Sequence, residues 1–470
     1  MPNVIDADLC VIGAGAAGLS VAAGAAQLGR KVVLVEKGKM GGDCLNYGCV
    51  PSKALLAAAA RAQAMRDGGK FGVYGEPTVD FPAVMAHVRA AVAAIAPHDS
   101  QERFEGLGAT VIREAGAFVG PRALAAGEHE IRAKHFVVAT GSSPAVPPIP
   151  GLEAAPYLTN ETVFDLDALP GHLVIVGGGP IGCELGQAFR RLGARVTIID
   201  ALEILNREDP EAVGLLRARL DAEGVALRER AKIARIDARA GAVSVALEGG
   251  ETVEGSHLLL AVGRRANVDG LGLEAAGVAY TDKGIVVDDR LRTSNRRIYA
   301  AGDVAGGPQF THLAGDHAST IVRNILFKMP ARRRDRLAPR ATYTDPEIAA
   351  VGLSEEEAAK DHPGARSARW RFADNDRAQT EGRTEGFLKL VADQRGRILG
   401  ASAAGAGAAE AIGLVCFAMA DKMSMRAFTN VMPAYPTRGE IVKRAAGAWY
   451  APALFSDRTR LLVRLLALFD

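Results

Sequence analysis

The sequence predicts an α/β protein in which one strand–helix–strand unit occurs twice. The chain has 470 residues, which is too long for one hydrophobic core and suits two or three domains. Residues 9–37 read LCVIGAGAAGLSVAAGAAQLGRKVVLVEK, an apolar strand, a glycine cluster, an Ala-rich helical stretch and a second apolar strand. Residues 173–200 read LVIVGGGPIGCELGQAFRRLGARVTIID and repeat this order, with every equivalent position offset by 164 residues.

Composition excludes several classes of protein. Apolar residues make up 49% and charged residues 23%, which is ordinary for a globular protein. The net charge of +2 gives no support for a nucleic-acid or acidic-membrane partner. The start, MPNVIDADLCVIG, lacks the basic and apolar regions of a signal peptide, and no apolar run is long enough to span a bilayer. We therefore expect a cytoplasmic protein, in which five cysteines are too few for a structural disulfide framework.

The spacing of the glycines predicts two dinucleotide sites. In each unit the first glycine permits a tight turn, the second lets the backbone approach a pyrophosphate, and the third allows close packing of helix and strand. These glycines are Gly13, Gly15 and Gly18 in the first unit and Gly177, Gly179 and Gly182 in the second. Glycine turns without a nucleotide are the alternative, but two complete copies of the motif argue against it.

An acidic residue ends each unit. Glu36 and Asp200 follow the second strands and favour a free ribose 2′-hydroxyl over a 2′-phosphate. The first basic residue after Asp200 is Arg207. The sequence therefore favours NADH over NADPH as the nicotinamide cofactor.

Two cysteines follow directly on the first unit, in GGDCLNYGCVPSK. Cys44 and Cys49 are close enough in sequence for their sulfurs to meet within one distorted helical turn. Lys53 and a helix N-terminus would both favour thiolate over thiol, as exchange chemistry requires. Two inert buried cysteines are the alternative, but the flanking glycines and the adjoining nucleotide unit favour a redox-active pair.

These motifs resemble those of the pyridine nucleotide–disulfide oxidoreductases, the family of lipoamide dehydrogenase, glutathione reductase and mercuric reductase. GGDCLNYGCVPSK is similar to the family's active-site disulfide, VVATGSSP and LLLAVGRRAN to its two interdomain crossovers, and RIYAAGDVAGG to its second flavin motif. TDPEIAAVGLSEEEA, from Thr344, is similar to the start of its interface domain. The resemblance implies two Rossmann-like domains and a C-terminal α+β dimerisation domain. FAD would bind to 1–150 and 268–338, NAD(P)H to 151–267, and 339–470 would dimerise.

The resemblance also implies roles for individual residues. Cys49 would be the flavin-proximal thiol, able to form a charge-transfer complex, and Cys44 the interchange thiol that meets substrate. Lys53 and Glu184 would form an ion pair beside flavin N5. The implied FAD-binding residues are Gly13, Gly15, Gly18, Glu36, Lys37, Gly42, Lys53, Ala117, Thr140, Gly141, Gly302, Asp303 and Ala314. Those implied for NAD(P)H are Gly177, Gly179, Gly182, Asp200, Gly263 and Arg264, and no metal site is expected.

One position departs from most of the family. Many relatives end with His-Pro-Thr and then a Glu, whereas MPAYPTRGE places Tyr435 at the His position and keeps Glu440. An unperturbed Tyr has a pKa of about 10, so Tyr435 is a poor thiol base at neutral pH. We expect slow turnover of dihydrolipoamide or glutathione. Tyr435 either lies at the catalytic site or only packs at the interface. A cis peptide bond is predicted between Tyr435 and Pro436.

The resemblance predicts a homodimer that passes electrons from NAD(P)H through FAD to Cys44–Cys49 and on to a small disulfide, lipoyl-type or thiol-reactive substrate. Dihydrolipoamide dehydrogenase is one alternative. A mercuric-ion-type reductase is another, although no cysteine pair follows Cys416. A membrane-associated redox sensor is a third, because the tail RTRLLVRLLALFD has the pattern of an amphipathic helix. We favour packing of that tail within the dimer over membrane binding, since one short helix with few basic residues binds membranes weakly.

Overall fold

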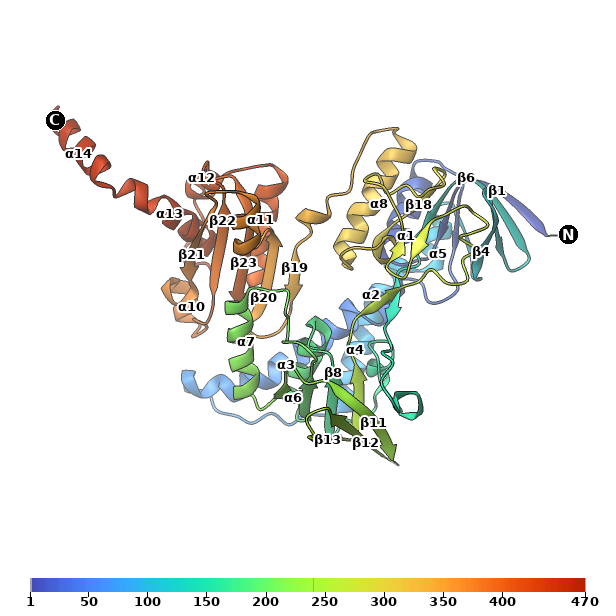
Figure 1. The fold of residues 1–470 in the computed structure, drawn as a ribbon, viewed down its shortest axis with the longest axis horizontal. Helices are drawn as coiled ribbons and strands as arrows, with labels where there is room; N and C mark the ends of the chain where they lie inside the picture. Colours follow the sequence, from blue (N-terminus) through green and yellow to red (C-terminus); the bar gives the residue numbers. More distant parts are fainter. Residues whose placement is uncertain (1, 240, 470) are drawn as a thin grey trace. The chain divides into compact units, whose positions relative to one another are not determined.

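The first repeat lies in a seven-stranded sheet of the computed structural model, which describes residues 2–239 and 241–469 (Figure 1). The strand order is β3-β2-β1-β6-β5-β4, and β18 also pairs with β6. The bounds are β1 (Asn3–Ile12), β2 (Val32–Val35), β3 (Ala109–Ile112), β4 (Gly116–Gly120), β5 (Ala123–Ala126), β6 (His129–Val138) and β18 (Ile298–Ala300). β1, β2, β3, β6 and β18 are parallel to one another, whereas β4 and β5 form an antiparallel edge next to β6. Parallel strands are covered on both faces, so β2 is a wholly buried run of apolar residues.

The second repeat forms a four-stranded parallel sheet with the matching order, β10-β9-β8-β14. Its strands are β8 (His172–Val176), β9 (Arg195–Ile199), β10 (Ala226–Arg228) and β14 (His257–Leu260). β11 (Ile233–Arg239), β12 (Ala242–Leu247) and β13 (Thr252–Gly255) form an antiparallel sheet of their own. The two-fold occurrence of one βαβ topology, predicted from the glycine spacing, is confirmed.

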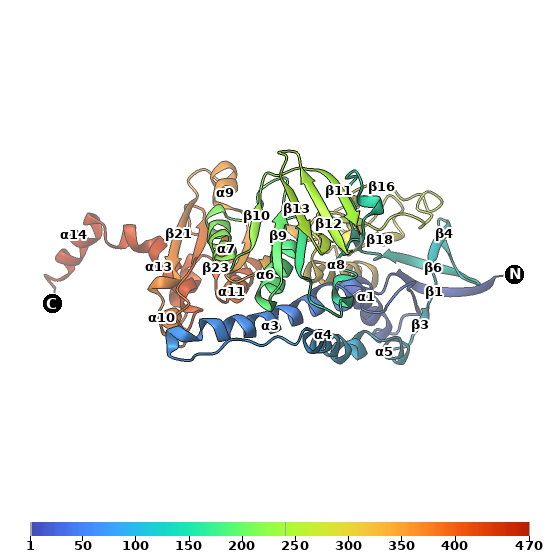
Figure 2. The same cartoon turned by 90° about the horizontal axis from the view of Figure 1, so that it is seen from below.

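Helices pack on these sheets and on one another. α1 (Ala16–Gln27) crosses from β1 to β2, and α6 (Pro180–Leu192) makes the equivalent crossing from β8 to β9. α8 (Thr311–Leu326) packs against α1, while α3 (Cys49–Arg66) packs against α4 (Phe81–Ile95) and α6 (Figure 2). The shorter α2 (Gly42–Asn46) and α5 (Gln101–Gly106) complete this part of the chain. β7 (Ser142–Pro144) and β15 (Arg264–Ala266) pair where the chain leaves and re-enters the first nucleotide domain.

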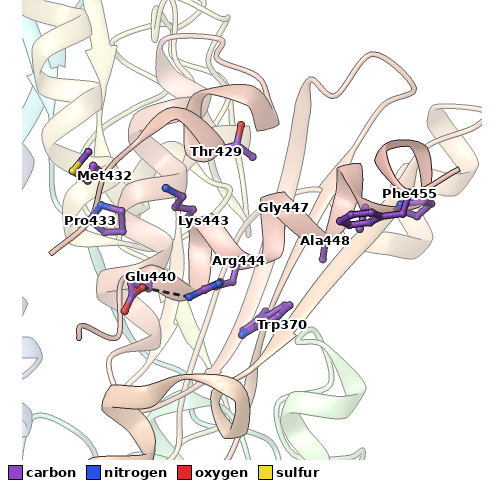
Figure 3. Close-up of a pocket in the computed structure, with 12 residues that line it drawn as sticks. Trp370, Thr429, Met432, Pro433, Glu440, Lys443, Arg444, Gly447, Ala448 and Phe455 are labelled. Atoms are coloured by element: carbon purple, nitrogen blue, oxygen red, sulfur yellow. Dashed lines mark ion pairs between the residues drawn. The ribbon is translucent and has the colours of Figure 1, made fainter. Parts of the chain in front are cut away.

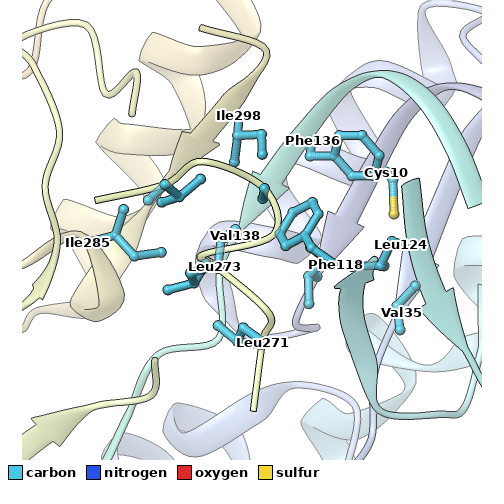
Figure 4. Close-up of a cluster of buried hydrophobic side chains, with 14 of the residues drawn as sticks. Cys10, Val35, Phe118, Leu124, Phe136, Val138, Leu271, Leu273, Ile285 and Ile298 are labelled. Atoms are coloured by element: carbon cyan, nitrogen blue, oxygen red, sulfur yellow. The ribbon is translucent and has the colours of Figure 1, made fainter. Parts of the chain in front are cut away.

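A buried cluster joins the first sheet to the segment that returns after the second repeat (Figure 4). Phe118 and Phe136 meet edge to face, with ring centroids 5.2 Å apart. Leu271, Leu273 and Ile285, from beyond the second repeat, lie in the same cluster. Two stretches far apart in sequence therefore share one hydrophobic core.

The C-terminal part is an antiparallel five-stranded sheet with the order β19-β20-β23-β22-β21. Its strands are β19 (Arg340–Thr342), β20 (Glu347–Gly352), β21 (Arg366–Arg371), β22 (Phe387–Ala392) and β23 (Ile398–Gly405). Its helices are α9 (Glu355–Asp361), α10 (Asp376–Thr380), α11 (Ala408–Ala420), α12 (Met425–Asn430), α13 (Glu440–Leu454) and α14 (Asp457–Leu466). α11 and α13 pack on the sheet, and the predicted α+β class of this region is confirmed.

The chain divides into two compact units. One runs to Glu203 and resumes from Val225 to Asp335, and the other comprises Ile204–Gly224 and the residues from Arg336 onward. α7 (Pro210–Ala222) thus clusters with the C-terminal sheet, where Lys389 Nζ lies 2.9 Å from Asp209 Oδ2. The domain boundaries expected from the sequence stay a prediction. No helix among the described residues is long and apolar enough to cross a membrane.

Candidate active site

The two glycine motifs form near-identical backbone cradles. A Cβ on Gly13 (φ +104°) would overlap the carbonyl oxygen of Ala139, and a Cβ on Gly177 (φ +110°) would overlap that of Ala261. α1 begins after Gly15 and α6 after Gly179, and no side chain caps the first backbone N–H groups of either helix. Backbone N–H groups at such helix starts suit a pyrophosphate.

The acidic residues that follow β2 and β9 also occupy equivalent positions in the two units. Glu36 Oε2 accepts a hydrogen bond from the amide of Ala14 at 2.6 Å, and Asp200 Oδ2 accepts one from the amide of Gly178 at 2.6 Å. Each acid is therefore held beside the glycine turn of its own unit, where the motif places a ribose. The two cradles fit two dinucleotides on the geometry of the backbone alone.

The cysteine pair lies where two helices meet. Cys44 is in α2, Cys49 is the first residue of α3, and Tyr47 and Gly48 interrupt the helical path between them. Cys44 and Cys49 are both free cysteines, and a hydrogen bond links their side chains. The hydroxyl of Thr311, the first residue of α8, is 3.4 Å from Cys49 Sγ. Cys49 and Thr311 are 262 residues apart in the sequence, so local spacing could not predict this contact.

The two thiols have opposite acidities. The hydrogen bond from Cys44, the Thr311 hydroxyl and the Lys53 ammonium lower the pKa of Cys49 to about 6, against the opposing effects of burial and of Asp43. The same hydrogen bond and burial raise the pKa of Cys44. Cys49 is therefore the thiolate of the pair at neutral pH, and Cys44 keeps its proton.

Reduced protein should accordingly gain thiolate absorbance in the ultraviolet across about pH 5–7, half complete near pH 6. The fraction of thiolate increases as pH rises through this lowered pKa. Cys49→Ser should lose the transition, whereas Cys416→Ser, on α11 in the C-terminal unit, should keep it. A transition centred above about pH 8, the range of an ordinary thiol, would contradict the assignment.

Lys53 and Glu184 form the ion pair that the sequence implied. Lys53 Nζ lies 2.7 Å from Glu184 Oε2, and the Glu184 side chain is only 6% exposed. Lys53 is one turn beyond Cys49 on α3, while Glu184 is on the first turns of α6. The pair thus connects the helix that carries the cysteine with the second nucleotide unit.

A second network connects the cysteine turn with the interdomain crossovers. Arg264 in β15 pairs with Asp43 at 2.9 Å and donates to the hydroxyl and carbonyl oxygens of Ser142 in β7. Ser142 Oγ in turn donates to Asp303 Oδ2 at 2.5 Å. Asn160 also contacts Asp43 through its amide nitrogen, at 3.0 Å. The guanidinium of Arg264 is engaged in these contacts, so its expected role at NAD(P)H stays a prediction. Asp43, Ser142 and Asn160 are site residues that the motifs did not reveal.

The implied second flavin motif is closely packed. Gly302 (φ +70°) faces Ala314 of α8 and Ala17 of α1, and its amide donates to Nδ1 of the buried His317. Burial raises the pKa of Asp303, although the hydrogen bond from Ser142 opposes the shift. Further expected FAD residues surround the first sheet: Thr140 and Gly141 precede β7, Ala117 is in β4, and the exposed Lys37 follows β2. Gly263, expected at NAD(P)H, precedes β15 with φ +118°.

Tyr435 and Glu440 lie in the C-terminal unit. The Tyr435–Pro436 bond is cis, as predicted, and the Tyr435 hydroxyl donates to Asp376 Oδ2 at 2.9 Å. That hydrogen bond raises the pKa of Tyr435. Glu440 begins α13 and accepts from the amide of Thr437 at 3.4 Å. Tyr435 is thus even less suited to act as a base than an ordinary tyrosine.

The remaining cysteines are packing residues. Cys10 and Cys183 are wholly buried, and burial raises the pKa of each. Cys416 packs against the core of the C-terminal sheet. Within the described ranges, no three His, Cys, Asp or Glu side chains gather as a metal site would require.

Comparison with known proteins identifies the family. The model of the pyridine nucleotide–disulphide oxidoreductases matches residues 7–318, and that of their dimerisation domain matches residues 338–446. The chain belongs to this family. It is a flavoprotein disulfide reductase in which FAD and NAD(P) binding are family properties, and the dimerisation domain supports a homodimer.

Two curated relatives are equally similar to this chain. A mercuric reductase from Streptomyces lividans is 35% identical over 451 residues, covering 93% of this chain and 95% of the relative. Dihydrolipoyl dehydrogenase 3 from Pseudomonas aeruginosa is 35% identical over 468 residues, covering 93% and 97%.

Solved structures share the fold. The Cu(II) complex of RclA, an HOCl-induced flavoprotein disulfide reductase from Escherichia coli, has a TM-score of 0.84 at 29% identity, covering 93% of this chain and 98% of that chain. LpdA from Mycobacterium tuberculosis has a TM-score of 0.86 at 28% identity, covering 93% and 99%.

Proposed function

We propose that this family member is an NADH-dependent reductase whose Cys44–Cys49 pair passes electrons to a small disulfide or another thiol-reactive substrate. One observation carries the proposal: Cys49 is a low-pKa thiol at the start of α3, on the same helix as Lys53 of the Lys53–Glu184 pair. For a disulfide substrate the sum is NADH + H⁺ + RSSR → NAD⁺ + 2 RSH.

The chain's residues divide this task. Bound FAD supplies a two-electron carrier between NADH and the cysteines. The Gly13 cradle, with Glu36, would hold its adenosine half, and the Gly177 cradle, with Asp200, would hold NADH. Lys53 stabilises the Cys49 thiolate, and Cys44 attacks the substrate disulfide once its proton has passed to that thiolate.

The loop after β9 supports the preference for NADH. Asp200 is fixed by two backbone amides, those of Gly178 and Leu202. Glu203 follows closely and pairs with Arg230, so the cation that could meet a 2′-phosphate there already has a carboxylate partner. Two carboxylates at this turn favour the free ribose hydroxyls of NADH.

The substrate side favours an acceptor that needs no strong base from the enzyme. The Tyr435 hydroxyl keeps its proton and donates a hydrogen bond to Asp376, so it can offer substrate an oxygen lone pair but cannot readily take a proton from a thiol. This observation disfavours dihydrolipoamide dehydrogenase, even though a relative at 35% identity carries that name. The second candidate function is reduction of a thiol-bound metal ion, supported by the mercuric reductase relatives and by the RclA–Cu(II) complex.

A substrate panel tests the proposal with purified holoenzyme. Consumption of NADH or NADPH would be followed with lipoamide, glutathione disulfide, coenzyme A disulfide, small aromatic disulfides, Hg(II) and Cu(II). We expect NADH to exceed NADPH at least about tenfold in kcat/KM, and reactive disulfides or metal ions to exceed lipoamide by a similar factor.

Two results would contradict the proposal. Fast oxidation of dihydrolipoamide by NAD⁺ would show that Tyr435 does not limit thiol deprotonation, and would favour dihydrolipoamide dehydrogenase. Equal use of NADH and NADPH would remove the inferred role of Asp200 and Glu203.

A further inference from the structure

The C-terminal helix α14 is exposed along its whole length among the described residues. None of its residues is buried, and Leu461, Leu462, Leu465 and Leu466 are each between 51% and 57% exposed. Leu461 and Leu465 share one face and Leu462 and Leu466 the adjoining one, with Arg458 at the N-terminal end of this apolar surface, whereas Arg460 and Arg464 lie on the opposite, polar side. A helix with so broad an apolar surface is normally covered.

The junction with α13 directs α14 away from the rest of its unit. Only Phe455 and Ser456 separate the two helices. Ser456 caps α14 by accepting from the amide of Thr459, and the Thr459 hydroxyl donates to the carbonyl of Ala453 at 2.9 Å. α14 projects beyond α13 in both views (Figures 1 and 2). The helix cannot fold back on α13 without breaking this junction.

A groove follows the exposed side of α13 (Figure 3). It has a volume of about 750 Å³, and its floor is made by Gly447, Ala448 and Ala451, whose small side chains permit close approach of a second helix. Trp370 and Phe455 supply aromatic walls. The groove extends from Glu440 to Phe455, about 22 Å of helix, whereas α14 is about 15 Å long.

We propose that α14 of one chain lies in the α13 groove of a second copy, so that the dimer interface extends beyond the part shared with the family. The match to the dimerisation domain ends at residue 446, inside α13, and the groove floor continues that same helix. A two-fold axis would make the contact twice, since each chain carries one α14 and one groove. The apolar side of α14 would face the small-residue floor, and Arg460 and Arg464 would face water.

The competing proposal is that the apolar side of α14 lies on a membrane surface. Asp457 offsets one of Arg458, Arg460 and Arg464, which leaves a net charge of +2, and one helix of this length and charge binds anionic lipid weakly. A groove that is long enough for α14 and continuous with the dimerisation domain favours a second copy.

Subunit exchange between differently labelled holoenzyme dimers tests the proposal. Truncation after Ser456 should accelerate exchange at least about tenfold, because it removes a buried apolar contact from each half of the dimer. Gly447→Lys should do the same from the other side. A Cβ at Gly447 meets no atom within 4 Å, so this change fills the groove without disturbing the chain that carries it.

Matched variants separate the possible results. Leu461→Gln with Leu465→Gln should accelerate exchange, whereas Arg460→Gln with Arg464→Gln should leave it unchanged. Truncation combined with Gly447→Lys should exchange no faster than the faster single variant, because both remove one contact. Unchanged exchange after truncation would overturn the proposal, as would fully additive effects. Truncation-dependent binding to phosphatidylglycerol vesicles with unchanged exchange would overturn it in favour of a membrane.

Discussion

Cys44→Ser is expected to reduce disulfide turnover by at least about a thousandfold, because the variant retains no second sulfur with which to form or exchange a disulfide. NADH-dependent reduction of a one-electron dye should stay within about twofold of the unchanged enzyme. The nucleotide cradles and the Lys53–Glu184 pair do not depend on the sulfur of Cys44. Steady-state rates with one disulfide and one dye measure both quantities.

Two further cysteine variants serve as controls for the loss of disulfide turnover. Cys49→Ser should also abolish disulfide turnover, and it should remove the thiolate transition near pH 6 as well. Cys183→Ser changes a buried sulfur that donates to the carbonyl of Gly178, and it should affect stability more than chemistry. If Cys44→Ser retains disulfide turnover, the proposed electron path is wrong.

Gly177→Ala should abolish NADH oxidation while FAD stays bound. The new methyl group would overlap the carbonyl of Ala261 at a φ of +110°, so the backbone turn must move at a cost of at least about 1–2 kcal/mol. The displaced turn would no longer present its amides to the NADH pyrophosphate. Flavin absorbance of the purified variant and the KM for NADH measure the two effects.

Gly13→Ala is the equivalent change in the first cradle and should instead yield protein that loses FAD, because its methyl group would overlap the carbonyl of Ala139. Gly179→Ala serves as the steric control. A Cβ there meets no atom within 4 Å, so folding should be unchanged and only the KM for NADH should rise. Loss of FAD from Gly177→Ala, with NADH affinity unchanged, would reverse the assignment of the two sites.

The local parts of the site were predictable from sequence. Glycine spacing determined both cradles, because tight turns and close backbone approaches restrict the choice of residue at single positions. The closeness of Cys44, Cys49 and Lys53 followed from helical spacing over ten residues, and a cis bond was expected before Pro436. The family's residue pattern also placed Glu184 opposite Lys53, although physical spacing alone could not.

The connections between distant segments were decided by tertiary structure. Several contacts join residues that are at least 59 positions apart in the sequence. They are those of Thr311 with Cys49, of Arg264 with Asp43 and Ser142, and of Asp376 with Tyr435. The sequence around either residue does not predict such a contact, because each residue type is common in its own strand or turn.

The repeat and the closeness of Cys44 and Cys49 were therefore determined by the sequence itself, through rules that act within one turn or one strand. The difference in acidity between the two thiols, the hydrogen-bond partner of the Tyr435 hydroxyl and the exposure of α14 within its own chain were decided only by the folded chain. These properties depend on burial and on partners brought from elsewhere in the chain, and neither is encoded locally.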